Sequence, residues 1–173
     1  IVNTLTGELI SEHKRIATPK PATPENIARC LAELIRETGW TGPVGCGFPA
    51  TVHHGVAYSA SNIDPSWINT DAQSLFSQVT DCPCFVVNDA DAAGMAEMRF
   101  GAGGEKSGVT LLLTIGTGIG SAVFVNGELH PNTELGHLKF AGSIAERYCA
   151  ESTRITQQLS WQEWGSRFNE YLN

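Results

Sequence analysis

The sequence has little positive charge. Lys and Arg number 11 against 18 Asp and Glu, which gives a formal net charge of -7, and charged residues make up only 17% of the 173 positions. A nucleic-acid-binding surface needs clustered Lys and Arg, so this balance argues against a nucleic-acid partner. Disorder is also disfavoured, because disordered chains combine high charge with few apolar residues, and here 42% of the residues are apolar.

Long apolar runs are missing as well. No stretch approaches the ~20 consecutive apolar residues that cross a bilayer, so no membrane partner is expected, and no signal peptide is visible. The five cysteines are odd in number and irregularly spaced, which makes a disulfide framework a poor interpretation. Cys82 and Cys84 could point the same way on an extended segment, but no second pair at metal-ligand spacing accompanies them, so no metal site is predicted. A cytoplasmic location follows as the default.

Glycine is abundant, with 18 residues, and strand patterns alternate with helical patterns, which predicts an α/β fold. Thr23 and Pro24 are typical of a helix start and Gly39 of a helix end. Ser160 and Glu163 form a capping box for a last helix. Further helices are expected at 71–79, at 90–100 and from 143 onward, and strands within 1–16 and at 44–48, 56–58, 85–87, 109–114 and 122–125. The β-branched run predicts that the strand at 85–87 is buried, and Asn126-Gly127 is typical of a tight hairpin turn.

The strongest functional signal is the glycine-rich loop Gly116-Thr117-Gly118-Ile119-Gly120. It lies between two expected strands, whereas a dinucleotide-binding loop joins a strand to a helix and a P-loop is followed by Lys-Ser or Lys-Thr, so both of these interpretations fail. Backbone N–H groups of such a loop can still bind phosphate oxygens, because glycine permits positive φ values and close approach. Thr114 and Thr117 add hydroxyl donors. A tight hairpin without a ligand is the alternative.

Two polar motifs accompany the loop. Asn88-Asp89 directly follows the expected strand at 85–87, and ligands of open α/β sheets gather at the C-terminal ends of strands. One of these two residues could instead be simply the N-cap of the next helix. Glu134 and His137 are three residues apart and can converge on one small ligand, or else lie in a surface turn. Together, the three signals suit phosphoryl transfer to a polyhydroxyl acceptor.

These motifs resemble those of the ROK family of sugar kinases. The segment 113–122, LTIGTGIGSA, is similar to the family's second phosphate motif, and 87–93, VNDADAA, to its catalytic segment. The segment 131–137, PNTELGH, is similar to its sugar-binding segment, and 59–67, SASNIDPSW, to a further stretch on the sugar side. The resemblance covers essentially the whole chain and is closest to family members that phosphorylate glucose from inorganic polyphosphate or ATP.

The resemblance implies an actin-like ATPase fold of the ribonuclease-H-like type, with two lobes around a cleft. Residues 1–107 would form a small N-terminal lobe that lacks its first strand and first phosphate motif. Residues 108–173 would begin a large C-terminal lobe and leave it incomplete, and the glycine cluster at 101–108 would be a hinge or linker. The chain is therefore expected to be a piece of a longer kinase, truncated at both ends and inactive by itself.

Carried over residue by residue, the resemblance implies that Asp89 is the general base that accepts the proton of the sugar 6-hydroxyl. Sugar hydroxyls would be bound by five residues, Asn62, Asn88, Glu134, His137 and Glu146. The phosphoryl donor would be held by residues in and beside the glycine loop, Thr114, Gly116, Thr117, Gly118 and Gly120. The implied substrates are glucose, with mannose as a second hexose, and polyphosphate or ATP together with Mg²⁺.

The sequence departs from the family's pattern at one notable place. Many ROK proteins carry a cysteine-rich zinc site after the Gly-His pair, whereas only Cys149 lies near Gly136-His137 here, so no zinc is expected. The resemblance also implies a homodimer for the full-length protein. Long polyphosphate favours a basic track, for which the chain offers few candidates, Arg99, Lys106 and Lys139.

A regulator without enzymatic activity is the alternative function, because ROK relatives include sugar-binding repressors. Such repressors carry an N-terminal DNA-binding helix-turn-helix, and no such segment is visible in this sequence. The presence of Asp89 at the catalytic position also favours the kinase.

Overall fold

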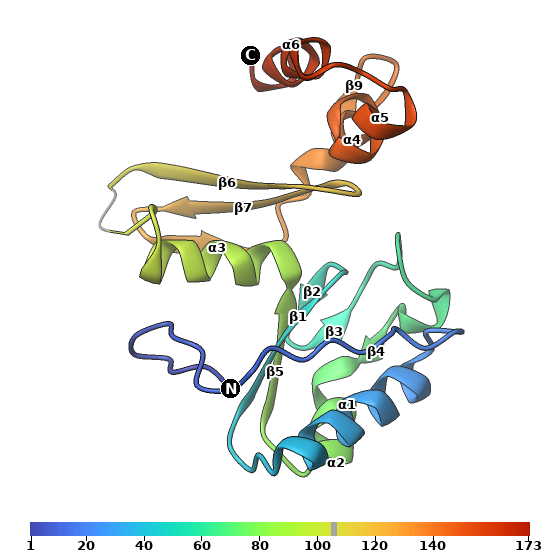
Figure 1. Ribbon diagram of the computed structural model, residues 1–173, viewed down its shortest axis with the longest axis vertical. Helices are drawn as coiled ribbons and strands as arrows, with labels where there is room; N and C mark the ends of the chain where they lie inside the picture. Colours follow the sequence, from blue (N-terminus) through green and yellow to red (C-terminus); the bar gives the residue numbers. More distant parts are fainter. Residues whose placement is uncertain (105–106) are drawn as a thin grey trace. The chain divides into compact units, whose positions relative to one another are not determined.

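A computed structural model describes residues 1–104 and 107–173. The chain divides into two compact units, Ile1–Gly104 and Glu105–Asn173, and each is described by itself (Figure 1). The predicted hinge at 101–108 includes two residues that lie outside the described ranges. One of them is Lys106, a candidate for the basic track that would bind polyphosphate. The boundary predicted at residue 107 therefore stays a prediction.

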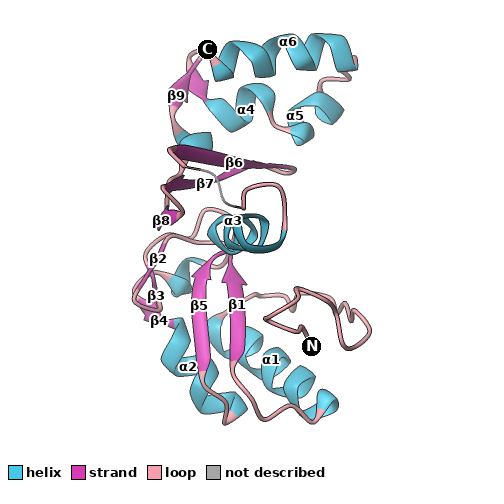
Figure 2. Cartoon of the chain, turned by 90° about the vertical axis from the view of Figure 1, so that its left-hand side faces the viewer, coloured by secondary structure: helices cyan, strands magenta, loops and turns pink. Residues whose placement is uncertain are grey.

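The first unit is built on two parallel strands, β1 (Val44–Phe48) and β5 (Cys84–Asn88), which are paired along their whole length. The helices α1 (Pro24–Thr38) and α2 (Ala72–Thr80) pack against one face of this pair (Figure 2). The helix α3 (Asp89–Phe100) follows β5 without a break. The unit is completed by an antiparallel ribbon and a 3-10 turn, namely β2 (Val52–His53), β3 (Val56–Ala57), β4 (Thr70–Asp71) and η1 (Pro65–Trp67).

The ends of α1 follow directly from the sequence. Thr23 accepts the backbone N–H of Asn26 at 3.4 Å as the N-cap, and Gly39 ends the helix with a left-handed φ of 63°, as predicted. The two strands expected within 1–16 are reduced to one isolated bridge between Val2 and Leu9. No helix among the described residues, α1 with its 15 residues included, is long and apolar enough to cross a membrane.

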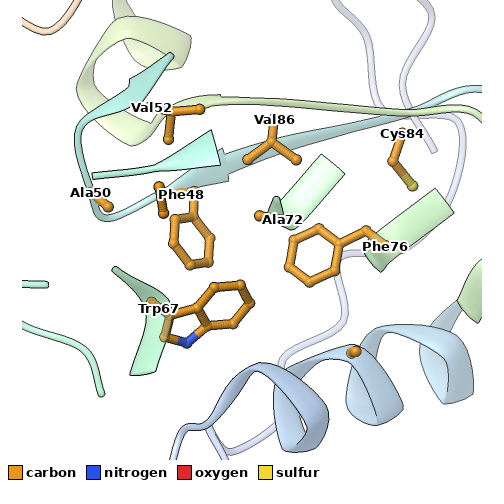
Figure 3. Close-up of a cluster of buried hydrophobic side chains, with 10 residues drawn as sticks. Phe48, Ala50, Val52, Trp67, Ala72, Phe76, Cys84 and Val86 are labelled. Atoms are coloured by element: carbon orange, nitrogen blue, oxygen red, sulfur yellow. The ribbon is translucent and has the colours of Figure 1, made fainter. Parts of the chain in front are cut away.

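Three aromatic rings form the centre of the first unit's core (Figure 3). The Trp67 ring lies 4.6 Å from that of Phe48 and 5.8 Å from that of Phe76, measured between centroids. Trp67 is fully buried, and its indole N–H donates to the carbonyl of Ala22 at 2.9 Å, which removes the cost of burying a polar group. This core holds the strand end from which Asn88 and Asp89 emerge.

The strand predicted at 85–87 is present, but only one of its two faces is buried. Side chains alternate between the two faces of a strand. Val86 points into the core and is 4% exposed, whereas Phe85 points away from it and is 58% exposed. A β-branched or aromatic run therefore predicts the strand correctly and its burial incorrectly.

The cysteines behave as apolar residues. All five are free thiols, and Cys82, Cys84 and Cys149 are buried. The Cys82 thiol donates to the carbonyl of Trp40 at 3.7 Å. Burial raises the pKa of Cys46 to about 11, so this thiol is neutral at physiological pH and is a poor metal ligand or nucleophile.

The second unit starts with an antiparallel sheet of three strands, β6 (Val109–Ile115), β7 (Ile119–Val125) and β8 (Glu128–His130). Asn126 and Gly127 form the predicted tight turn, both with positive φ. The segment from 143 was expected to be helical but opens with a short strand. The later elements are η2 (Leu135–His137), β9 (Lys139–Phe140), β10 (Ser143–Ile144), α4 (Ala145–Cys149), α5 (Glu151–Thr156) and α6 (Trp161–Leu172).

The last helix, α6, packs against α4. Its start has the predicted capping box, with Ser160 and Glu163 each bonded to the other's backbone N–H. The indole N–H of Trp164 donates to the carbonyl of Cys149 at 2.9 Å, and Phe168 packs on the buried cluster that contains Cys149 and Ile119. This packing fixes the position of α4, which carries Glu146.

Candidate active site

Asn88 lies where β5 ends and α3 begins. Its Oδ1 accepts the backbone N–H groups of Ala90 at 2.9 Å and Asp91 at 3.1 Å, and its Nδ2 donates to the carbonyl of Ala50 at 3.1 Å. The side chain is buried. Asn88 is therefore the N-cap of α3, which is the alternative that the sequence left open. The second hydrogen on Nδ2 is available to donate a hydrogen bond to a sugar hydroxyl.

Asp89, in contrast, is exposed at the first position of α3. One carboxylate oxygen, Oδ1, accepts the backbone N–H of Ala90 at 2.9 Å. The N-terminus of a helix stabilises negative charge, which suits a carboxylate that has to accept a proton from a ligand. Asn62, the remaining predicted sugar residue of this unit, lies in an exposed loop between β3 and η1.

Three predicted sugar-binding residues of the second unit lie together, and we call Glu134, His137 and Glu146 the Glu-His-Glu cluster. The Nδ1 atom of His137 lies 3.5 Å from Oε2 of Glu134, and its Nε2 atom lies 3.7 Å from Oε1 of Glu146. The side chains are between 22% and 37% exposed, so solvent and ligands reach them. Their oxygens and imidazole nitrogens can bind several hydroxyl groups of one small molecule.

Strand β7 holds this cluster in place through two contacts that the sequence did not predict. One is made by Ser121 of β7 and the other by Gly136 of η2. The buried Ser121 hydroxyl donates to the carbonyl of Thr133 and accepts the backbone N–H of Leu135 at 3.0 Å, which fixes both neighbours of Glu134. Gly136 lies directly against the backbone of Ile119, where an added Cβ would overlap the carbonyl oxygen. No local sequence signal marks either contact, because both depend on how η2 packs on β7.

The glycine loop is shorter than the sequence suggested. It was expected to extend over 116–120, but β7 already begins at Ile119, so the turn consists of residues 116–118. Thr114 and Gly120 are paired opposite each other in the β6–β7 ladder, next to the turn and not in it. Within the turn, the N–H of Gly116 donates to the carbonyl of Gly118 at 3.0 Å.

The turn is fastened to two helices of the same unit. Ser152 of α5 donates its backbone N–H to the carbonyl of Gly116 at 3.1 Å and its hydroxyl to the carbonyl of Thr117 at 2.6 Å. Glu146 of α4 accepts the N–H of Ile119 at 3.4 Å. Among the described residues, no hydrogen bond is seen from the backbone N–H of Thr117 or of Gly118, so these two groups remain as donors for an anion.

Gly118 has a different reason to be glycine from the one the sequence suggested. A Cβ at this position would overlap Oε2 of Glu146. The missing side chain therefore makes room for the carboxylate, which in turn contacts both Ile119 and His137. Gly118 thus supports the Glu-His-Glu cluster in addition to forming part of the predicted phosphate loop.

We predict that Gly118→Ala weakens binding of glucose, the substrate that the family resemblance implies, about tenfold with little loss of stability. The overlapping atom is the end of a flexible side chain, so Glu146 can move away at small cost but then loses its present position. A displaced charge-assisted hydrogen bond is worth about 1.5–3 kcal/mol. Calorimetric titration with glucose and a thermal melt measure the two effects. Gly165→Ala, where an added Cβ meets nothing, is the control, and unchanged glucose affinity in Gly118→Ala would contradict this account.

Comparison with known proteins decides the family. Residues 1–155 match the ROK family. The chain belongs to the ROK family. The resemblance carried by the four motifs is therefore confirmed, and so is the predicted α/β fold of the actin-like ATPase type.

Three similar proteins illustrate where in the family this ROK chain lies. It is 43% identical over 173 residues to the polyphosphate glucokinase of Mycobacterium tuberculosis (strain CDC 1551 / Oshkosh), covering 99% of this chain and 65% of that protein. The solved inorganic polyphosphate/ATP-glucomannokinase of Arthrobacter sp. strain KM matches with a TM-score of 0.93 and 43% identity, over 99% of this chain and 70% of that one. A ROK family glucokinase of Streptomyces griseus, in complex with glucose and AMPPNP, matches with a TM-score of 0.70 and 27% identity, over 83% of this chain and 51% of that one.

The match to the mycobacterial relative covers nearly all of this chain but only part of the relative. The chain spans just under two thirds of the length of the mycobacterial relative, while almost all of its own residues are aligned. The ROK fold and the arrangement within each unit belong to the chain itself.

Proposed function

We propose that this ROK protein is a glucokinase that transfers a phosphoryl group from inorganic polyphosphate or ATP to the 6-hydroxyl of glucose. The observation that carries the proposal is the position of Glu146, which contacts His137 on one side and the N–H of Ile119, beside the glycine loop, on the other. A group suited to sugar hydroxyls thus adjoins a loop suited to phosphate. Phosphoryl transfer depends mainly on holding acceptor and donor side by side.

In the proposed reaction, the oxygen of the sugar 6-hydroxyl attacks the terminal phosphorus of the donor. A new O–P bond forms, the bond from that phosphorus to the rest of the donor breaks, and the hydroxyl proton passes to the carboxylate of Asp89. The exposure of Asp89 at the start of α3 supports this role, because the carboxylate is accessible to a ligand. General-base catalysis of this kind typically contributes 10²–10⁴-fold to the rate.

The other predicted residues would orient the two substrates. The Glu-His-Glu cluster, with Asn62 and the remaining amide hydrogen of Asn88, would bind the hydroxyl groups of glucose. The N–H groups of Thr117 and Gly118 would bind oxygens of the terminal phosphate, as consecutive backbone amides do in anion-binding turns. Thr114 and Gly120, which are paired near the ends of β6 and β7, would support that turn, and Gly116 would form its first residue. Mannose is proposed as a second acceptor.

Mg²⁺ is proposed to arrive with the donor. Within the described residues, no three side chains among His, Cys, Asp and Glu come together in a way that could hold a metal ion. In kinases Mg²⁺ is usually held by one or two carboxylates together with phosphate oxygens and water, so its binding does not require such a group of three. When bound, the ion neutralises charge on the phosphates. The steps assigned above to this chain's residues do not depend on its position.

Two further features of the proposal concern the protein as a whole. A cytoplasmic location is supported by five free cysteines, since reduced thiols persist in that compartment. A homodimer of the full-length protein is proposed on the family resemblance. Light scattering of the purified full-length protein would test the dimer.

A coupled assay for glucose 6-phosphate tests the proposed function directly. We expect the protein encoded by the complete gene to turn over glucose with Mg²⁺ and either ATP or polyphosphate, and the 173-residue chain alone to show little turnover. Mannose in place of glucose tests the second acceptor. Glucose binding without turnover from any donor would overturn the kinase and favour the sugar-binding regulator, and turnover with ATP alone would remove polyphosphate from the proposal.

A further inference from the structure

We propose that Ser152 is a positioning residue that orients the two donor-binding N–H groups of the glycine loop. This inference rests on the proposed function, because it concerns how the same site binds the phosphoryl donor. Ser152 lies in the first turn of α5, and its N–H and hydroxyl bond two consecutive carbonyls, at 3.1 Å to Gly116 and 2.6 Å to Thr117. One residue therefore fixes two successive peptide planes of the turn.

The geometry of the peptide bond converts these two contacts into an orientation of the N–H groups. In a planar trans peptide, the carbonyl of one residue and the N–H of the next point in opposite directions. The carbonyl of Gly116 is directed at Ser152, so the N–H of Thr117 points away from α5. The carbonyl of Thr117 is also directed at Ser152, so the N–H of Gly118 points away from α5 as well. Both N–H groups thus face the same general side.

The remaining carbonyl of the turn follows the same pattern. The carbonyl of Gly118 accepts the N–H of Gly116 at 3.0 Å, and the N–H of the next residue, Ile119, donates to Glu146 at 3.4 Å. Every carbonyl from 116 to 118 therefore has a donor within this unit. A phosphate that approaches the turn meets N–H groups without a repelling carbonyl oxygen between them, which is the arrangement of anion-binding backbone turns.

The contact with the turn also provides the backbone N–H of Ser152 with a hydrogen-bond acceptor, which stabilises the contact. The first N–H groups of a helix have no partner within the helix. The N–H of Ser152 satisfies this need by donating to Gly116 rather than to water, and its hydroxyl adds the second bond. Because the donors are held before the ligand arrives, less order has to be imposed on binding. Without the hydroxyl, the Thr117–Gly118 peptide can rotate and present its carbonyl oxygen to the phosphate.

The test compares Ser152→Ala with Ser152→Thr in the full-length protein. Ser152→Ala is expected to weaken binding of inorganic tripolyphosphate, and to raise the KM for the phosphoryl donor, about tenfold. Its kcat is expected to change less than twofold, and so is its affinity for glucose. Ser152→Thr, which keeps a hydroxyl, should restore donor binding to within about twofold. Ser166→Ala on α6 removes a comparable hydroxyl, bonded to the carbonyl of Gln162 at 3.0 Å, and should change none of these values.

The remaining outcomes test the role of Ser152 and the kinase activity separately. Unchanged tripolyphosphate binding in Ser152→Ala, or an equal loss of tripolyphosphate and glucose binding, would overturn the positioning role. A wild-type protein that binds no tripolyphosphate would overturn it too. A wild-type protein that binds tripolyphosphate, loses it in Ser152→Ala and yet never phosphorylates a sugar would overturn the kinase and support the role of Ser152. Shifts of the Thr117 and Gly118 backbone ¹⁵N resonances with tripolyphosphate would locate the bound anion.

Discussion

Replacing Asp89 with alanine is expected to lower the turnover of glucose by about 10²–10⁴-fold, the usual contribution of a general base. The proton of the 6-hydroxyl would then have no acceptor at the start of α3. Glucose should still bind, with an affinity within about tenfold of the wild type, because the Glu-His-Glu cluster lies in the other compact unit and does not depend on Asp89. Steady-state kinetics and calorimetric titration with glucose measure the two quantities.

Two further variants show whether the loss is chemical. Asp89→Asn keeps the size of the side chain and can keep the bond to the N–H of Ala90, but an amide does not accept the proton, so turnover should fall as far as in Asp89→Ala. Asp81→Asn removes a carboxylate at the C-cap of α2, where φ is 54°, a conformation that Asn also tolerates. It should leave turnover unchanged. Near-normal turnover in Asp89→Asn would remove Asp89 from the catalytic role.

The features that the sequence predicted well depend on neighbours within a few residues. Thr23 bonds the N–H three positions later, Ser160 and Glu163 cap each other, and Gly127 lies in its turn with positive φ. Each of these preferences is a property of the local backbone and needs no knowledge of the tertiary fold. The same locality explains why Glu134 and His137, three residues apart, could be paired by spacing.

The contacts that organise the site span much longer stretches of chain. Ser152 reaches Thr117 across 35 positions, and Glu146 reaches Ile119 across 27. Glu146 entered the predicted site only through the family resemblance, and Ser152 did not enter it at all, because a serine in the first turn of a helix usually only satisfies that helix. Such contacts are set by how α4 and α5 pack on the sheet, which spacing and propensity do not encode.

Strand burial was the other point at which local reasoning failed. Phe85 has the side chain of a core residue, yet the parallel pair of β1 and β5 is covered on one face by α1 and α2, and Phe85 lies on the other. A side chain's face is decided by its register relative to the packed helices. Hydrophobicity predicted that residues 85–87 form a strand, but it could not predict which of their side chains are buried in the core.

Gly136→Ala is expected to be the most destabilising small substitution in the second unit, at a cost of about 3 kcal/mol, the upper end for overpacking. An added Cβ would overlap the carbonyl oxygen of Ile119 and lie 3.0 Å from its carbonyl carbon. Those atoms are backbone in β7, so they cannot rotate away as the Glu146 side chain can for Gly118. The turn η2 would have to move off the strand, and Glu134 and His137 would move with it. Glucose affinity should therefore fall at least tenfold, and the thermal melt should shift downward.

The contrast with Gly165→Ala makes this expectation specific to the site. Gly165 lies in the middle of α6, and an added Cβ there meets no other atom. Alanine is favoured over glycine inside a helix by about 0.5–1 kcal/mol, so the same substitution should raise the melting temperature and leave glucose affinity unchanged. The two variants thus differ in sign for one chemical change. A Gly136→Ala protein that melts like the wild type would show that η2 can leave β7 at little cost, and the close backbone contact would then not be what positions Glu134 and His137.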